Sequence, residues 1–136
     1  MTNTAQLRRQ HGEMAELASA LLESAQRAAF EQTRGALAAL AGKLSVHAAI
    51  EDQGVYPRLA DHTDPCIRDS ATRLQLAFGD LRRRVDLLAK SWLPRNTIEG
   101  AHDEFMREAS ALVRELGERM QAEERDLYDV LDAMAH

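Results

Sequence analysis

The chain has 136 residues, of which 45% are hydrophobic and 29% charged, a balance that fits one globular domain over residues 1–136 and leaves no room for a second core. Its net charge of -5, with no basic run longer than residues 82–84, argues against nucleic acid and anionic membranes as partners. The single cysteine, Cys66, excludes an internal disulfide and a multi-cysteine metal site. Because no apolar run reaches the length of a signal peptide core or a membrane span, we expect a cytoplasmic domain.

Helix-forming residues dominate the whole chain. Glycine and proline are scarce, at 7 and 3 residues, and only 4% of residues are aromatic, so we expect an all-α fold. Helix-breaking residues divide the chain at 32–35, 62–65 and 94–97. Asp64 followed by Pro65 is typical of a helix start, and Asn96 or Thr97 is expected to cap the fourth helix. Short connections between four long helices predict an up-down-up-down antiparallel four-helix bundle.

Each predicted helix carries an apolar stripe at spacings of three and four residues, which is typical of a helix with one face in a shared core. The stripe of the fourth helix is expected to end with Leu127, Val130 and Met134. Five ionisable residues occupy stripe positions on the first, second and fourth helices: His11, His47, Glu51, Arg119 and Glu123. Because a buried charge is costly unless it is paired or binds a metal, these five residues form the candidate site.

Loop positions predict that these residues lie at one depth in the bundle. Two residues of an antiparallel helix pair are level when their midpoint falls at the connecting turn, and for His11 and His47 this midpoint is close to the first predicted turn. The same reasoning places Phe78 of the third helix opposite Glu51. His47 and Glu51 are four residues apart on one helix face, and imidazole together with carboxylate suits iron, zinc or manganese.

Two segments of the chain echo each other. Residues 44–59 (LSVHAAIEDQGVYPRL) and 116–131 (LGERMQAEERDLYDVL) align without gaps. The alignment pairs three positions of the second helix with three of the fourth: His47 with Arg119, Glu51 with Glu123 and Tyr56 with Tyr128.

Three groups of residues form recognisable motifs. The first group is the segment 7–14 (LRRQHGEM), which contains His11. The second group is His47, Glu51, Tyr56 and Pro57, and the third is Glu123, Glu124 and Tyr128. Over essentially the whole chain, these motifs resemble those of the hemerythrin-like family, including its HHE cation-binding members. The first group is similar to the histidine motif of the family's first helix, the second to the HxxxE element of its second helix, and the third to the end of its fourth-helix motif.

The resemblance implies a bundle whose core holds two non-haem irons, with histidines on all four helices and two bridging carboxylates. It implies that His11 and His47 bind one iron and that Glu51 and Glu123 are the bridging carboxylates. The activities associated with the family are reversible oxygen binding, redox or nitric oxide sensing, and iron handling. Around these ligands we expect three aromatic side chains: Tyr56, Phe78 and Tyr128.

The sequence departs from the family pattern at the second iron. No histidine occurs between His62 and His102, so the third helix supplies no imidazole. Arg119 stands where the family has its fourth-helix histidine, and a guanidinium stays charged and cannot bind a metal. We therefore expect no ordinary two-iron centre, and we expect His102 at the end of the bundle.

Two interpretations of the site stay open on the sequence alone. In the first, one non-haem metal ion, iron or else zinc or manganese, is held by His11, His47, Glu51 and Glu123, and the domain binds or senses the metal or a small ligand such as oxygen or nitric oxide. In the second, no metal binds, Arg119 pairs with a glutamate in a buried network, and the domain is a scaffold or signalling module with a protein partner. Neither interpretation makes the chain an enzyme, because the sequence has no nucleophile with an adjacent base and no phosphate-binding loop. The oligomeric state also stays open.

Overall fold

The computed structural model describes residues 4–134, and all secondary structure in that range is helical, which confirms the all-α prediction. Four long helices form the body of the molecule: α1 (Thr4–Gln26), α2 (Phe30–Gly54), α4 (Pro65–Trp92) and α6 (His102–Glu123). The remaining elements are short: α3 (Tyr56–Ala60), α5 (Thr97–Gly100), the π-helical segment η1 (Glu124–Tyr128) and α7 (Asp129–Met134). No helix of residues 4–134 is both long and apolar enough to cross a bilayer.

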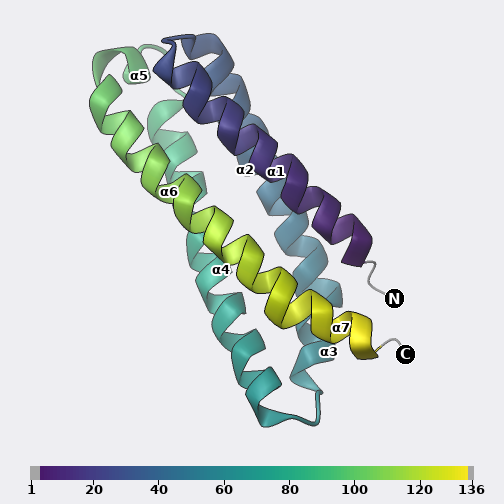
Figure 1. Cartoon of the computed structure of the whole chain (residues 1–136). Helices are drawn as coiled ribbons and strands as arrows, with labels where there is room; N and C mark the ends of the chain where they lie inside the picture. Colours follow the sequence, from purple (N-terminus) through teal and green to yellow (C-terminus); the bar gives the residue numbers. More distant parts are fainter. Residues whose placement is uncertain (1–3, 135–136) are drawn as a thin grey trace.

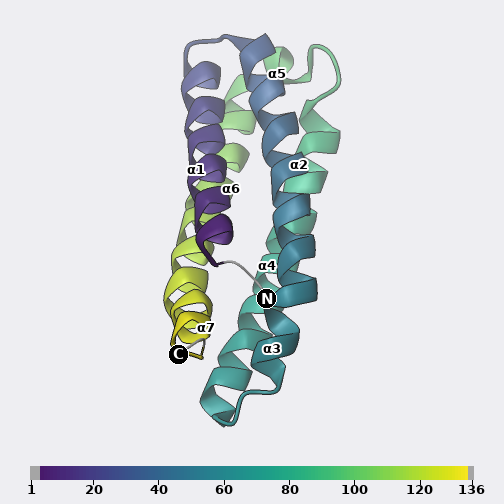
Figure 2. The same cartoon turned by 90° about the vertical axis from the view of Figure 1, so that its right-hand side faces the viewer.

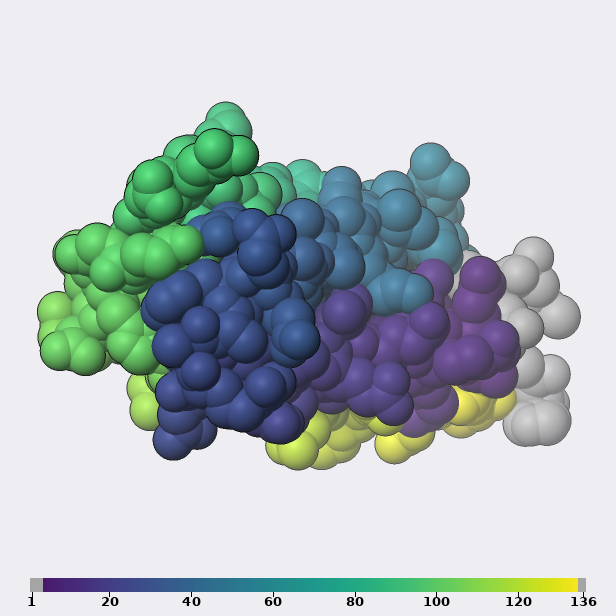
Figure 3. All heavy atoms as spheres, turned by 90° about the horizontal axis from the view of Figure 1, so that it is seen from above, coloured from purple at the N-terminus to yellow at the C-terminus, as the bar shows by residue number. Residues whose placement is uncertain are grey.

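The long helices lie side by side in a bundle (Figures 1 and 2). α1 packs against α2 and α6, and α4 packs against the same two helices. The start of α1 lies beside the end of α7 (Figure 1), where the Thr4 hydroxyl donates to Asp132 at 2.5 Å. At the opposite end, seen from above in Figure 3, the α1–α2 turn lies beside the segment that contains α5, and Arg34 forms an ion pair with Glu99 at 2.9 Å.

The first two helix boundaries show where residue type predicts a turn and where it does not. The chain turns within residues 26–30, so Gly35 lies inside α2 and the break predicted at 32–35 is wrong. The break at 62–65 is confirmed. There the Asp64 carboxylate accepts a hydrogen bond from the Cys66 N–H at 2.9 Å, which caps the first turn of α4.

Ala28 ends α1 in a left-handed backbone conformation that an alanine in the sequence does not predict. Its φ of 60° is left-handed, and the N–H groups of Ala28 and Ala29 donate to the carbonyls of Ala25 and Ser24, which is the Schellman pattern of a helix C-terminus. Glycine or asparagine usually occupies such a position, so alanine gives no turn signal. His102 adds to this cap from α6, since its Nε2 lies 2.7 Å from the Ala25 carbonyl oxygen, and the histidine is therefore at the end of the bundle, as expected.

The third connection is longer than predicted, and the fourth long helix begins at His102. Asn96 has a left-handed φ of 70° and forms no side-chain cap, and the Thr97 hydroxyl donates backwards to the Trp92 and Pro94 carbonyls. These bonds close a tight turn followed by the short helix α5. The prediction that Asn96 or Thr97 caps the fourth long helix is therefore wrong.

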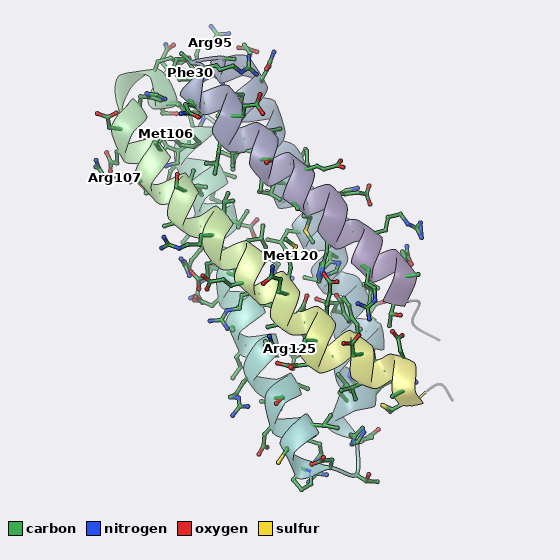
Figure 4. All side chains as sticks on the ribbon, in the orientation of Figure 1. Phe30, Arg95, Met106, Arg107, Met120 and Arg125 are labelled. Atoms are coloured by element: carbon green, nitrogen blue, oxygen red, sulfur yellow. The ribbon has the colours of Figure 1, made fainter. Side chains whose placement is uncertain are left out.

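Two apolar clusters fill the core, and a polar layer lies between them. The larger cluster includes Met14, Leu44, Phe78 and Met120, and the smaller includes Leu7, Val55, Leu74 and Leu127. On α1, for example, His11 falls between Leu7 of one cluster and Met14 of the other. On α6 the buried polar residue is Glu123. Figure 4 labels Met120 and Arg125, which lie on either side of Glu123 in the sequence and so mark the level of this layer.

The π-helical segment shifts the register of the fourth helix by one residue. The Asp129 N–H donates to the carbonyl of Glu124, five residues earlier, so one extra residue enters the turn. As a result Leu131 is buried, whereas Val130 is half-buried and Met134 is 40% exposed. The prediction that Met134 belongs to the core is therefore wrong, whereas Val130 is partly buried and packs against the smaller apolar cluster.

Candidate metal centre

Four of the five ionisable residues that interrupt the predicted stripes meet in the polar layer. They are His11, His47, Glu51 and Glu123, each at most 3% exposed. One potential ligand atom from each side chain lies within 4.8 Å of those of the other three. α1, α2 and α6 thus supply a compact His/Glu cluster that could hold a metal ion, and within residues 4–134 α4 adds no ligand to it.

The spacing of the donor atoms fits a single ion. The Nε2 atoms of His11 and His47 are 3.1 Å apart, and His11 Nε2 lies 3.0 Å from Glu123 Oε1. His47 Nε2 lies 3.3 Å from Glu51 Oε1. An ion with donor distances of about 2.1 Å holds neighbouring ligands about 3 to 3.5 Å apart, so these three pairs already have the spacing of neighbouring ligands.

Both imidazole rings are oriented from behind by hydrogen bonds to Nδ1. His11 Nδ1 lies 2.9 Å from the Glu124 carboxylate, and His47 Nδ1 lies 2.7 Å from the amide oxygen of Gln10. These two oxygens only accept hydrogen bonds, which assigns a proton to Nδ1 of each ring. In the neutral rings both Nε2 lone pairs then face the centre of the cluster, as metal ligands do.

Arg8 anchors the outer side of this arrangement. Its guanidinium lies 3.5 Å from Glu124 and forms ion pairs with Asp129 at 2.9 Å and Asp132 at 3.0 Å. It also lies over the Tyr128 ring, 5.5 Å from the ring centre. Sequence reasoning missed Gln10, Glu124 and Arg8 as supporting groups, although Gln10 and Glu124 are the direct chain neighbours of cluster residues.

The two tyrosines bind the two glutamates crosswise. The Tyr56 hydroxyl donates to Glu123 Oε2 at 3.0 Å, and the Tyr128 hydroxyl donates to Glu51 Oε2 at 2.5 Å. Each tyrosine follows a glutamate by five residues, and such positions point about 140° apart on a regular α-helix. The helix is interrupted at Val55 in one case and by the π-helical segment in the other, so both tyrosines face the core. In the two similar segments, the tyrosine of each one therefore donates a hydrogen bond to the glutamate of the other.

The cluster balances its charge with protons. Burial opposes a charge on His47, but hydrogen bonds to Glu123 and Glu51 outweigh it and raise the pKa of His47 to about 9. Burial raises the pKa of Glu51. Burial acts in the same direction on Glu123, but its hydrogen-bonding contacts with His11, His47 and Glu51 lower its pKa. Without a metal, protonation of His47 thus balances the negative charge of Glu123.

Arg119 does not take part in this balance. Its side chain is half-buried, its Nε has no hydrogen-bond partner, and in the described part of the chain it forms no ion pair with Glu51 or Glu123. The pairing of Arg119 with a glutamate, which the metal-free interpretation proposes, is therefore not formed among residues 4–134. Phe78 does lie at the site, with its ring centre 6.1 Å from that of His47.

A small cavity adjoins the cluster between α2 and α4. Its volume is about 40 Å³, and Glu51, Tyr56, Phe78 and Arg82 are among its lining residues. One water needs about 10 to 15 Å³ of such space, so the cavity holds a few waters or a diatomic molecule and nothing much larger.

Comparison with known proteins agrees with this geometry. The family model described as hemerythrin HHE cation-binding domain matches residues 2–133. No curated protein and no solved structure matches the chain.

Proposed function

Because the chain belongs to the hemerythrin HHE cation-binding family, we propose that it binds one non-haem transition-metal ion in its core. The ligands are the four cluster residues: His11, His47, Glu51 and Glu123. Iron is the first candidate, and zinc and manganese suit the same nitrogen and oxygen donors.

The observation that carries this proposal is the pair of imidazoles whose Nε2 atoms face each other at 3.1 Å. Two neutral nitrogens with their protons on Nδ1 repel each other there, and the buried site offers few ways to relieve the repulsion. A proton on one ring does so in the metal-free protein, and a metal ion does so for both rings while also neutralising the carboxylates.

We propose a single metal ion rather than two because α4 and α6 lack the ligands for a second one. We propose that the bundle has the up-down-up-down topology of its family, with α4 facing the cluster through Leu74 and Phe78, both buried and neither a ligand. Arg119 supplies no donor atom either. Three potential nitrogen ligands of a second metal are therefore missing.

The size of the adjoining cavity favours a small molecule as the ligand that the protein binds or senses. Its 40 Å³ fit a diatomic molecule such as oxygen or nitric oxide, and Glu51 forms part of its wall. We propose that the protein is a cytoplasmic metal-dependent binder or sensor and not an enzyme, since among residues 4–134 no nucleophile with an adjacent base accompanies the cluster.

Metal analysis of protein purified without a histidine tag tests the proposal. We expect about one iron, zinc or manganese ion per chain, and His47→Ala should remove it. His62→Ala is the matched control, because His62 lies in the α3–α4 connection and is not part of the cluster. A wild-type protein that stays metal-free after incubation with all three ions would refute the proposal.

The alternative is a metal-free scaffold for a protein partner. It is favoured by the hydrogen bonds of the cluster, which form a buried network without any metal. The large apolar side chains exposed among residues 4–134, which a partner would be expected to use, lie on three different helices: Val46, Leu76, Leu87 and Met134. The same metal analysis separates the two functions.

A further inference from the structure

The Tyr128 hydroxyl lies inside the metal cluster and not merely beside it. Its oxygen is 3.2 Å from Nε2 of both His11 and His47, 2.5 Å from Glu51 Oε2 and 3.4 Å from Glu123 Oε1. It is therefore as close to the histidine donors as the carboxylate oxygens are. We propose that Tyr128 is a fifth metal ligand, bound as a phenolate, and that the site is thereby adapted to ferric iron; this inference rests on the proposed function.

Tyr56 shows that this position is specific to Tyr128. The Tyr56 hydroxyl donates to Glu123 Oε2, the carboxylate oxygen other than the one that faces His11, and within residues 4–134 it forms no hydrogen bond with either histidine. The two tyrosines occupy equivalent positions in the sequence echo and both are buried. Only the one carried by the π-helical segment reaches the histidine nitrogens, and such local π turns are frequent at functional sites.

The environment of Tyr128 holds its ring in place. The ring is fully buried, lies 5.3 Å from the His11 ring between centres, and carries the Arg8 guanidinium on its face at 5.5 Å. Burial, together with the carboxylates of Glu123 and Glu51, raises the pKa of the Tyr128 hydroxyl, so it keeps its proton until a cation binds. The hydroxyl is thus fixed before a metal arrives, which lowers the ordering cost of coordination.

Charge counting favours ferric iron over a divalent ion. Two carboxylates and one phenolate carry three negative charges, which balance the three positive charges of Fe(III) in a buried site. Tyrosinate is a known type of iron ligand in proteins. With a divalent ion the same five donors leave one negative charge buried without a counter-ion, apart from the partly exposed Arg8.

Coordination requires Tyr128 to lose its proton. The O–H bond points to Glu51 Oε2, so the proton leaves along that hydrogen bond when the oxygen binds the ion. Glu51 lines the small cavity together with Asp52 and Gln75, whose side chains are exposed at the surface. The proton therefore has a polar route to bulk water, and no oxidant or reductant is needed when iron is supplied as Fe(III).

The test is the visible absorption spectrum of protein loaded with ferric citrate, together with its iron content. A phenolate bound to Fe(III) gives a charge-transfer band in the visible region, and the chain has only two tyrosines from which it can arise. We expect the band in the wild type and in Tyr56→Phe, and its complete loss in Tyr128→Phe. Resonance Raman spectra of wild-type protein labelled with ring-deuterated tyrosine check the assignment without any variant, and should show shifted phenolate modes.

The outcomes separate the inference from the proposed function. Iron bound without a phenolate band, or a band lost in Tyr56→Phe and kept in Tyr128→Phe, overturns the role of Tyr128 and leaves the one-metal site intact. Absence of bound iron, zinc and manganese overturns both. If Tyr128→Phe fails to fold by circular dichroism, the Raman isotope shift in Tyr56→Phe decides, because Tyr128 is the only tyrosine left in that variant, and the absence of the shift there refutes ligation by Tyr128.

Discussion

A carboxylate oxygen of Glu124 lies 2.9 Å from Nδ1 of His11. Glu124 directly follows the proposed ligand Glu123, and it thereby fixes the orientation of a second proposed ligand, His11 on α1. We expect Glu124→Ala to lower metal affinity by about 10- to 100-fold, because the freed imidazole loses its orientation and some of its basicity. Competition with a chromogenic chelator measures the affinity. Asp126→Ala is the control, since Asp126 lies on the same segment and pairs with the exposed Arg125. Equal losses in both variants would contradict this role.

The metal-free protein should lose stability as the pH rises. The pKa of His47 is raised from about 6.5 to about 9 in the folded state, so its contribution is complete below pH 6.5 and is lost as the pH rises through 9. The raised pKa of Glu51 acts in the same direction. The free energy of unfolding should therefore fall between pH 6.5 and 9, by at most about 1.4 kcal/mol per pH unit for each group.

Urea unfolding in the presence of a chelator measures this slope. The matched variant is His47→Gln, which keeps a polar side chain but cannot titrate, and its slope should be clearly smaller than that of the wild type. A wild-type stability that rises over this interval would show that His47 is not the protonated partner of the glutamates. Metal affinity should change in the opposite sense and increase with pH, since the ion and the proton compete for His47.

Arg119→Met should leave the free energy of unfolding unchanged within about 0.5 kcal/mol or increase it. The variant removes a buried Nε that has no partner and keeps the aliphatic part of the side chain. Chemical denaturation at pH 7 measures the effect. A loss of about 3 kcal/mol or more would mean that Arg119 neutralises buried carboxylates in solution, as the metal-free interpretation requires.

Ala28→Gly should increase the free energy of unfolding by about 1 kcal/mol, because glycine adopts the left-handed φ of this position without steric cost. Ala38→Gly is the control. Ala38 is exposed in the middle of α2, where the same substitution should cost about 1 kcal/mol. Thermal unfolding of the two variants gives the comparison, and destabilisation by both would contradict the assigned conformation of Ala28.

The sequence predicts the site better than it predicts the turns. His11, His47 and Glu51 stand in apolar stripes with helical spacing, and that spacing alone identifies them as buried polar residues in need of a partner. The first turn is mislocated because Ala28 carries no left-handed signal, and its cap depends on backbone hydrogen bonds and on His102 from a distant part of the chain. Residue type cannot report such a contact.

The part of the site that the sequence does not reveal depends on local helix geometry. An uninterrupted helix would turn Tyr128 away from Glu123, and the π-helical segment that brings both to the core has no composition of its own. Arg119 illustrates the opposite error. It occupies a stripe position next to the glutamates in the pattern, yet among residues 4–134 it forms no ion pair with Glu51 or Glu123, and its Nε has no hydrogen-bond partner.

The most direct test of the central claim is a crystal structure of the iron-loaded protein with anomalous scattering measured at the iron edge. We predict one peak per chain, about 2.1 Å from Nε2 of His11 and of His47, with carboxylate oxygens of Glu51 and Glu123 also bound to it. Two peaks in the core, or a single peak bound by surface carboxylates while these four side chains remain hydrogen-bonded to one another, would contradict it.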